Sequence, residues 1–115
     1  MTRTIAAVLA LFAAPASAQN LPPALNDYPT AARADYVLAC MTVNGRTRPM
    51  LDRCSCSIDI VASIIPYERY VQAETVLTMR QVGGERVGMF RSAPTANEAV
   101  QDLRRAQAEA EVRCF

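Results

Sequence analysis

The sequence predicts an all-α fold, a small four-helix bundle held together by two disulfides. Apolar residues recur at steps of three and four in four successive segments, which is the spacing of one helix face. Four cysteines all follow an N-terminal stretch with the pattern of an export signal, so they are expected to be oxidised. At 115 residues the chain can bury only a limited core, and covalent crosslinks would add usefully to its stability.

Residues 1–18 have the order of a cleaved secretory signal. Arg3 supplies a positive charge, residues 5–14 are apolar, and Ala16-Ser17-Ala18 provides the small residues that signal peptidase requires. This apolar run is about half of the roughly twenty residues that a membrane-spanning helix needs, and no later stretch is a better candidate. We therefore expect cleavage after Ala18, export to the periplasm and a mature protein with no membrane span.

Composition excludes several classes of function. Without its signal the chain is the length of one domain and has equal numbers of arginines and acidic residues. Nucleic acid and anionic membranes need a clustered basic face, so neither is expected as a partner. The chain contains no lysine, histidine or tryptophan, and the lack of histidine excludes imidazole metal sites and Ser-His or Cys-His catalytic pairs. No cofactor is predicted.

Residues 19–28 are rich in proline and asparagine and are predicted to form a flexible leader, so that the helical domain covers residues 29–115. Pro29 suits the first turn of a helix, and Asn44-Gly45 is typical of a helix end. The packed face of this first helix is predicted to consist of Ala32, Tyr36, Cys40 and Val43.

A second helix follows a polar connection at residues 46–49 and ends before Pro66. It is apolar on two adjoining faces, so it is predicted to be central in the bundle. Its main seam alternates steps of three and four, and a second stripe flanks it: Leu51, Cys54, Ile58, Val61 and Ile65, then Cys56, Ile60 and Ile64.

A third helix is predicted from Pro66 to about Gln81, followed by a glycine-containing loop that reaches Ser92. Thr95 and Glu98 have the spacing of a capping box, in which each side chain accepts from the backbone of the other residue. The final helix is predicted to run from there to about Cys114, with an alanine-rich packed face that allows close approach: Ala99, Leu103, Ala106 and Ala110.

Four cysteines allow three pairings. A bridge within Cys54-Ser55-Cys56 would close a very short ring and distort the backbone. In an antiparallel hairpin turning near Arg46, the residue opposite Cys40 falls near position 52, which is closer to Cys54 than to Cys56. The sequence therefore favours Cys40–Cys54 with Cys56–Cys114, while Cys40–Cys56 with Cys54–Cys114 stays open.

The Cys-Ser-Cys pair also allows an alternative function, a thiol-based copper or zinc carrier or a redox carrier. An exported thiol cluster would have to escape oxidation, and the Cys-x-x-Cys of redox proteins is absent. Methionines at these spacings are usually core residues rather than copper ligands. Structural disulfides are the preferred interpretation, and no metal is predicted. The methionines considered as ligands are Met41, Met50, Met79 and Met89.

Tyr67 and Tyr70 share a helix face with Glu74, and they are predicted either to cap the core or to form a partner-binding patch. Acidic residues near the central helices could pair for acid–base catalysis, but solvated helix faces are the preferred interpretation. The segment 83–88 lacks the preceding strand and the Gly-Lys-Ser/Thr ending of a phosphate loop. The acidic residues considered are Asp52, Asp59, Glu68 and Glu74.

The chain resembles two groups of known proteins, one in its architecture and the other in part of its sequence. The order of a signal peptide, about four short helices and a disulfide between them resembles the small periplasmic acid-stress chaperones of the HdeA type. This resemblance implies a helical, disulfide-linked protein that binds unfolding clients once acid has loosened it. The present chain differs in having four cysteines where that family has a single bridge.

The second resemblance is local. The chain is similar to small exported proteins of proteobacteria, some of which are encoded beside periplasmic quinoprotein alcohol-oxidation genes, and this implies an accessory protein without a catalytic residue. Together these features predict a non-enzymatic periplasmic protein, chaperone-like or partner-binding, whose partner is another exported protein. The matching residues are Tyr28-Pro29-Thr30-Ala31-Ala32-Arg33, Tyr36-Val37, Cys40-Met41, Asn44-Gly45 and Cys54-Ser55-Cys56-Ser57-Ile58-Asp59.

Overall fold

The computed structural model describes residues 26–84, 88 and 93–115, and it confirms the all-α prediction. The predicted signal at residues 1–18, and the expected leader up to residue 25, lie outside the described residues. Among those described, no helix is both long enough and apolar enough to cross a membrane. This described part of the chain holds four helices and two disulfides, the helices being α1 (Thr30–Asn44), α2 (Arg48–Ile64), α3 (Tyr67–Val82) and α5 (Pro94–Cys114).

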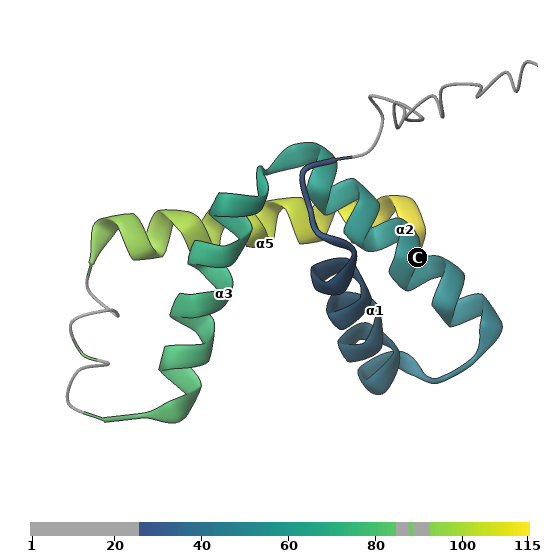
Figure 1. Cartoon of the computed structure of the whole chain (residues 1–115), viewed down its shortest axis with the longest axis horizontal. Helices are drawn as coiled ribbons and strands as arrows, with labels where there is room; N and C mark the ends of the chain where they lie inside the picture. The colour runs from purple at the N-terminus through teal and green to yellow at the C-terminus, as the bar shows by residue number, and fades with distance from the viewer. Residues whose placement is uncertain (1–25, 85–87, 89–92) are drawn as a thin grey trace, which may run out of the picture.

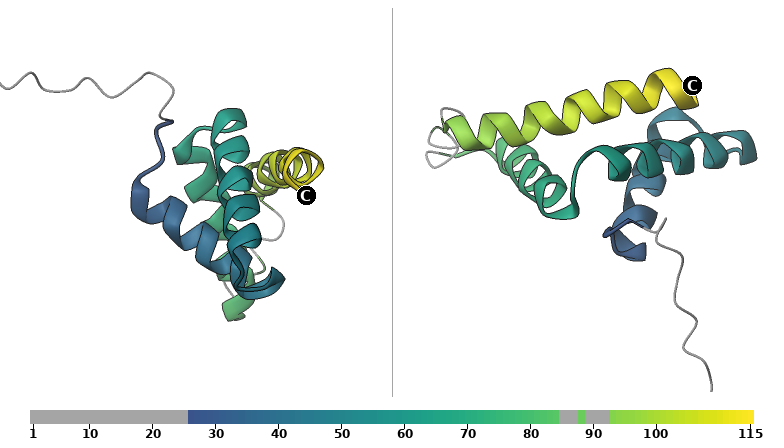
Figure 2. Two further views of the ribbon diagram at one scale, coloured as in Figure 1. Left: turned by 90° about the vertical axis from the view of Figure 1, so that its right-hand side faces the viewer. Right: turned by 90° about the horizontal axis from the view of Figure 1, so that it is seen from above.

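The centre of the fold is the pair formed by α2 and α5, which lie alongside one another (Figure 2). Ile58 and Val61 of α2 are almost completely buried, as is Leu103 of α5. The alanines predicted on α5 are buried too, and their small side chains let the two helices approach closely. Removing this apolar surface from water is the main stabilising contribution to the fold. The predicted central position of α2 is therefore confirmed.

The two remaining helices are attached to different members of the central pair. Helix α1 packs on α2, whereas α3 packs on α5, and both project from the same side of the pair (Figure 1). The bundle is consequently open on that side. Val43, predicted on the packed face of α1, is instead 83% exposed, because it borders this open side rather than the core.

Two helix starts differ from the sequence prediction. Helix α2 begins at Arg48, inside the expected connection, because Thr47 caps it by accepting a hydrogen bond from the Met50 N–H at 3.3 Å. The predicted capping box at Thr95 and Glu98 is wrong: the capping position of α5 is Ala93, two residues before Thr95, and no side chain caps the helix. Proline suits the first helical position, so Thr95 already lies inside the first turn.

The segment before α1 belongs to the folded domain, although the leader was expected to extend to residue 28. Tyr28 is 4% exposed, and its hydroxyl donates to the Ile65 carbonyl at 3.0 Å. Asp27 accepts a hydrogen bond from the Tyr67 N–H at 2.9 Å. These two contacts hold the chain against the corner between α2 and α3.

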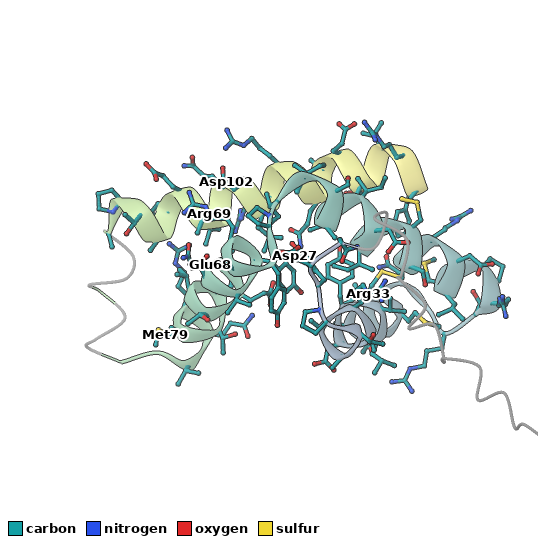
Figure 3. The ribbon with its side chains drawn as sticks, turned by 45° about the horizontal axis from the view of Figure 1, so that its top comes forward. Asp27, Arg33, Glu68, Arg69, Met79 and Asp102 are labelled. Carbon is teal, nitrogen blue, oxygen red and sulfur yellow. A yellow bond between two sulfur atoms is a disulfide. The ribbon has the colours of Figure 1, made fainter. Side chains whose placement is uncertain are left out.

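Ion pairs connect α3 to α5 on the side away from α1. Arg69 and Asp102 point toward one another (Figure 3), with the Arg69 Nε 2.8 Å from the Asp102 carboxylate. Arg105 also donates to Asp102, and hydrogen bonds from both arginines hold the pKa of that carboxyl below its ordinary value. Glu98 lies 3.8 Å from Arg69, so it takes part in this cluster instead of capping its own helix.

Candidate functional site

The four cysteines form two disulfides in the pairing that the sequence favoured. Cys40–Cys54 joins α1 to α2, and Cys56–Cys114 joins α2 to the end of α5. The other non-vicinal pairing is therefore wrong. No cysteine is free, and the described residues hold no cluster of three potential metal ligands among Cys, His, Asp and Glu. With both disulfides formed, all four cysteine sulfurs crosslink helices.

Tyr67 and Tyr70 pack with Tyr28 into an aromatic cluster. Their ring centroids lie 5.2 Å from that of Tyr28 and 6.3 Å from one another, distances typical of favourable aromatic pairs. Tyr70 is 9% exposed, while Tyr67 is half-buried. The two residues named as candidates thus lie together at the edge of the core, and their role in binding a partner stays a prediction.

A cleft opens between α1 and α3 and consists of two adjoining hollows. The larger, of about 660 Å³, is lined by all four helices, and the smaller, of about 490 Å³, is lined by α1 and α3 alone. Both hollows share Asp35, Tyr70 and Glu74. We call the two hollows together the α1–α3 cleft. The remaining lining of its larger hollow is Tyr36, Ala39, Cys40, Val43, Asn44, Ser57, Gln107, Glu111 and Phe115.

The described lining of the cleft is acidic, although the whole chain is nearly neutral. Asp35, Glu74 and Glu111 contribute three carboxylates, and no arginine of the described residues lines either hollow. Glu74 is half-buried and forms no hydrogen bond or ion pair with the part of the chain that the structure describes. Burial raises the pKa of Glu74 above its ordinary value.

Two tyrosine hydroxyls of the cleft differ in their bonding. The Tyr36 hydroxyl lies 2.9 Å from the Ser57 Oγ, so these two hydroxyl groups are hydrogen-bonded to one another. No hydrogen bond to the Tyr70 hydroxyl is formed within residues 26–84, 88 and 93–115. Burial and then the nearby Glu74 charge raise the pKa of Tyr70, so the phenol stays protonated and able to donate.

The other acidic residues considered from the sequence lie outside the cleft. Asp52 is exposed and 3.4 Å from Arg48 on the same helix, and Asp59 and Glu68 are exposed as well. These three acidic residues therefore lie on solvent-exposed helix faces, as preferred from the sequence. Glu74 instead lines the cleft together with Asp35. Sequence reasoning did not identify Asp35 or Glu111, because their neighbours in space come from other helices and no local spacing indicates them.

Comparison of the chain with family models, with curated proteins and with solved structures finds no match. The structure by itself defines a small all-α domain crosslinked by two disulfides, with one open side. Disulfides persist in oxidising compartments, so the chain is of the type that folds outside the reducing cytosol.

Proposed function

We propose that this chain is a non-enzymatic periplasmic binding protein, an accessory or chaperone-like module exported by the signal at residues 1–18. It binds another exported protein in the α1–α3 cleft. The observation that carries this proposal is the cleft itself, which is left open by the arrangement of α1 and α3. It is lined by tyrosines and by carboxylates that form no ion pair within the described residues. Concave surfaces with a few convergent polar groups are the usual binding sites of small domains.

The chemistry of the lining favours recognition over reaction. A serine nucleophile needs an adjacent base, but Ser57 is 5% exposed and shares its hydrogen bond with the Tyr36 hydroxyl. The chain has no histidine to act as that base. A thiol carrier would first require reduction of a bridge that connects two helices. Binding is the function that uses the cleft as it stands.

Apolar residues at the rim of the cleft support a protein partner. Val43 is 83% exposed and Phe115 is 49% exposed, and both line the larger hollow. A partner that covers them would gain the free energy of removing apolar surface from water.

Site-specific photocrosslinking tests the proposal. A photoreactive amino acid placed at Asn44 lies in the cleft, whereas the matched control at Arg104 is exposed on α5 and outside it. In periplasmic extract of the source organism, we expect one protein to become crosslinked from Asn44 and not from Arg104. Ala39 is exposed within the cleft, so Ala39→Trp should fill the cleft without disturbing the core and should remove that product. No product, or equal products from both positions, would refute the proposal.

A further inference from the structure

The α1–α3 cleft contains polar groups that the fold itself leaves without partners. Tyr70 is nine-tenths buried, lines both hollows and has no hydrogen-bond partner for its hydroxyl in the described chain. Glu74, one turn further along α3, is half-buried and forms no ion pair or hydrogen bond with the described residues either. Both side chains line open hollows, so their polar atoms are accessible to a ligand that offers hydrogen bonds or charge.

The charges on α3 are divided between two sides of the helix. Its arginines are held by α5: Arg69 contacts Asp102 at 2.8 Å, and Arg80 donates to the Asn97 side chain at 2.7 Å. The cleft side carries Glu74 and faces Asp35 of α1. Among the residues that the structure describes, no cation lines either hollow, so a complementary ligand is one that brings positive charge.

The shape of the cleft favours a side chain of a larger molecule over a free small cation. Asp35, Tyr70 and Glu74 lie where the two hollows meet, and both hollows are open to solvent. A polypeptide lying along the cleft can place one long basic side chain at this junction. Its neighbouring apolar residues can then cover Val43 and Phe115. Aromatic faces and carboxylates both attract guanidinium and ammonium groups.

We propose that the occupant of the α1–α3 cleft is a basic segment of the partner protein, whose arginine or lysine side chain enters between Asp35 and Glu74 and contacts Tyr70. This inference rests on the proposed function and adds the chemistry of the partner to it. The apolar rim sets the position of the segment, and the carboxylates select its charge.

Synthetic peptides of matched shape test this inference. The probe is a short acetylated and amidated peptide that repeats Leu-Arg-Ala, and its control carries citrulline, a neutral isostere, in place of each arginine. Binding to the oxidised protein is measured by calorimetry at low and at physiological ionic strength. We expect the arginine peptide to bind, the citrulline peptide to bind at least about tenfold more weakly, and salt to weaken only the former.

Variants of the protein locate the binding site. Glu74→Gln and Asp35→Asn should each weaken the arginine peptide about tenfold, since each removes a charge-assisted contact. Asp59→Asn is the matched control, because Asp59 is exposed on α2 and outside the cleft. Intact mass and circular dichroism establish that each variant is folded and keeps both disulfides. Equal binding of the two peptides, or equal loss from Glu74→Gln and Asp59→Asn, would overturn the inference.

Two further outcomes would show a different occupant. If spermidine alone binds as tightly as the arginine peptide, the cleft takes free amines and the inference of a protein segment is wrong. A concentration-dependent dimer abolished by Glu74→Gln would make the occupant a second copy, which also overturns it. Photocrosslinking from Asn44 separates the two proposals. A crosslinked partner that the arginine peptide does not displace leaves the proposed function intact and removes only the basic segment.

Discussion

Replacing both Cys56 and Cys114 by alanine is expected to lower the free energy of unfolding by about 4 kcal/mol. The bridge joins residues 58 apart, and a crosslink stabilises chiefly by reducing the conformational freedom of the unfolded chain. By the same relation, the Cys40–Cys54 bridge, which joins residues 14 apart, contributes about 3 kcal/mol. Domains of this size are stable by only about 5–15 kcal/mol, so either loss is a large fraction of the total.

The Cys56–Cys114 bridge is the cleaner one to remove. Both of its cysteines are half-exposed, so alanine leaves little cavity behind. Cys54 is fully buried, and its replacement would add the cost of lost packing to the loss of the bridge. Urea denaturation followed by circular dichroism at neutral pH measures the difference. We also expect a steeper dependence on urea in the variant, because its unfolded chain exposes more surface.

The outcome that would contradict this reasoning is a loss below about 1 kcal/mol with an unchanged urea dependence. The bridge would then do little to the unfolded chain, and its value would lie in the contacts of the folded state. A reduction experiment serves as the control, since it leaves the sequence unchanged. The two bridges together contribute about 7 kcal/mol to the free energy of unfolding, so the fully reduced protein is expected to be largely unfolded.

Three substitutions test other parts of the structure. Leu103→Ala removes a fully buried side chain of α5 and should lower the free energy of unfolding, measured by urea denaturation, by about 3 kcal/mol. A loss below about 1 kcal/mol would show that α5 repacks around the missing side chain. Tyr28→Phe leaves the Ile65 carbonyl without its donor and should cost about 1–2 kcal/mol, measured in the same way; an unchanged midpoint would show that water replaces the bond. Burial raises the pKa of Glu74 above 4.5, so its charge destabilises the folded state at neutral pH and Glu74→Gln should stabilise the protein there. Below pH 4.5 the Glu74 carboxyl is protonated in both the folded and the unfolded chain, so the stability gained by Glu74→Gln should vanish there. A gain that does not depend on pH would contradict a raised pKa for Glu74.

The helices follow from local patterns in the sequence, whereas the disulfide pairing was favoured by those patterns but not decided by them. The seam through Cys54 and Ile58 repeats with the period of a helix. A hairpin turning near Arg46 brings Cys40 closer to Cys54 than to Cys56, and the structure decides between the two pairings that this left open. The helices and the Cys40–Cys54 bridge depend on residues close together in the chain, where periodicity is informative, whereas Cys56 and Cys114 are 58 residues apart. The start of α5 was missed because two local signals compete there, and the proline at position 94 outweighs the threonine that follows it.

The cleft could not be predicted in the same way. Asp35 and Glu74 approach one another only because α1 and α3 pack on different helices of the central pair. The burial of Tyr28 also depends on a distant partner, the backbone at Ile65. Contacts between residues so far apart in sequence leave no periodic signal, so the sequence indicates Tyr70 and Glu74 as neighbours without showing what faces them.

The contacts of Asp27 and Tyr28 have a practical consequence for anyone who trims or tags this chain. The corner between α2 and α3 exposes a carbonyl at Ile65 and an N–H at Tyr67, and both are bonded by residues from before the first helix. A version trimmed to begin at residue 30 would keep every helix and both cysteine pairs, yet it would lose the two bonds that fix the angle at that corner. Because α3 forms one wall of the α1–α3 cleft, the width of the cleft is expected to change with that angle. Fusion partners and tags should therefore end ahead of Asn26.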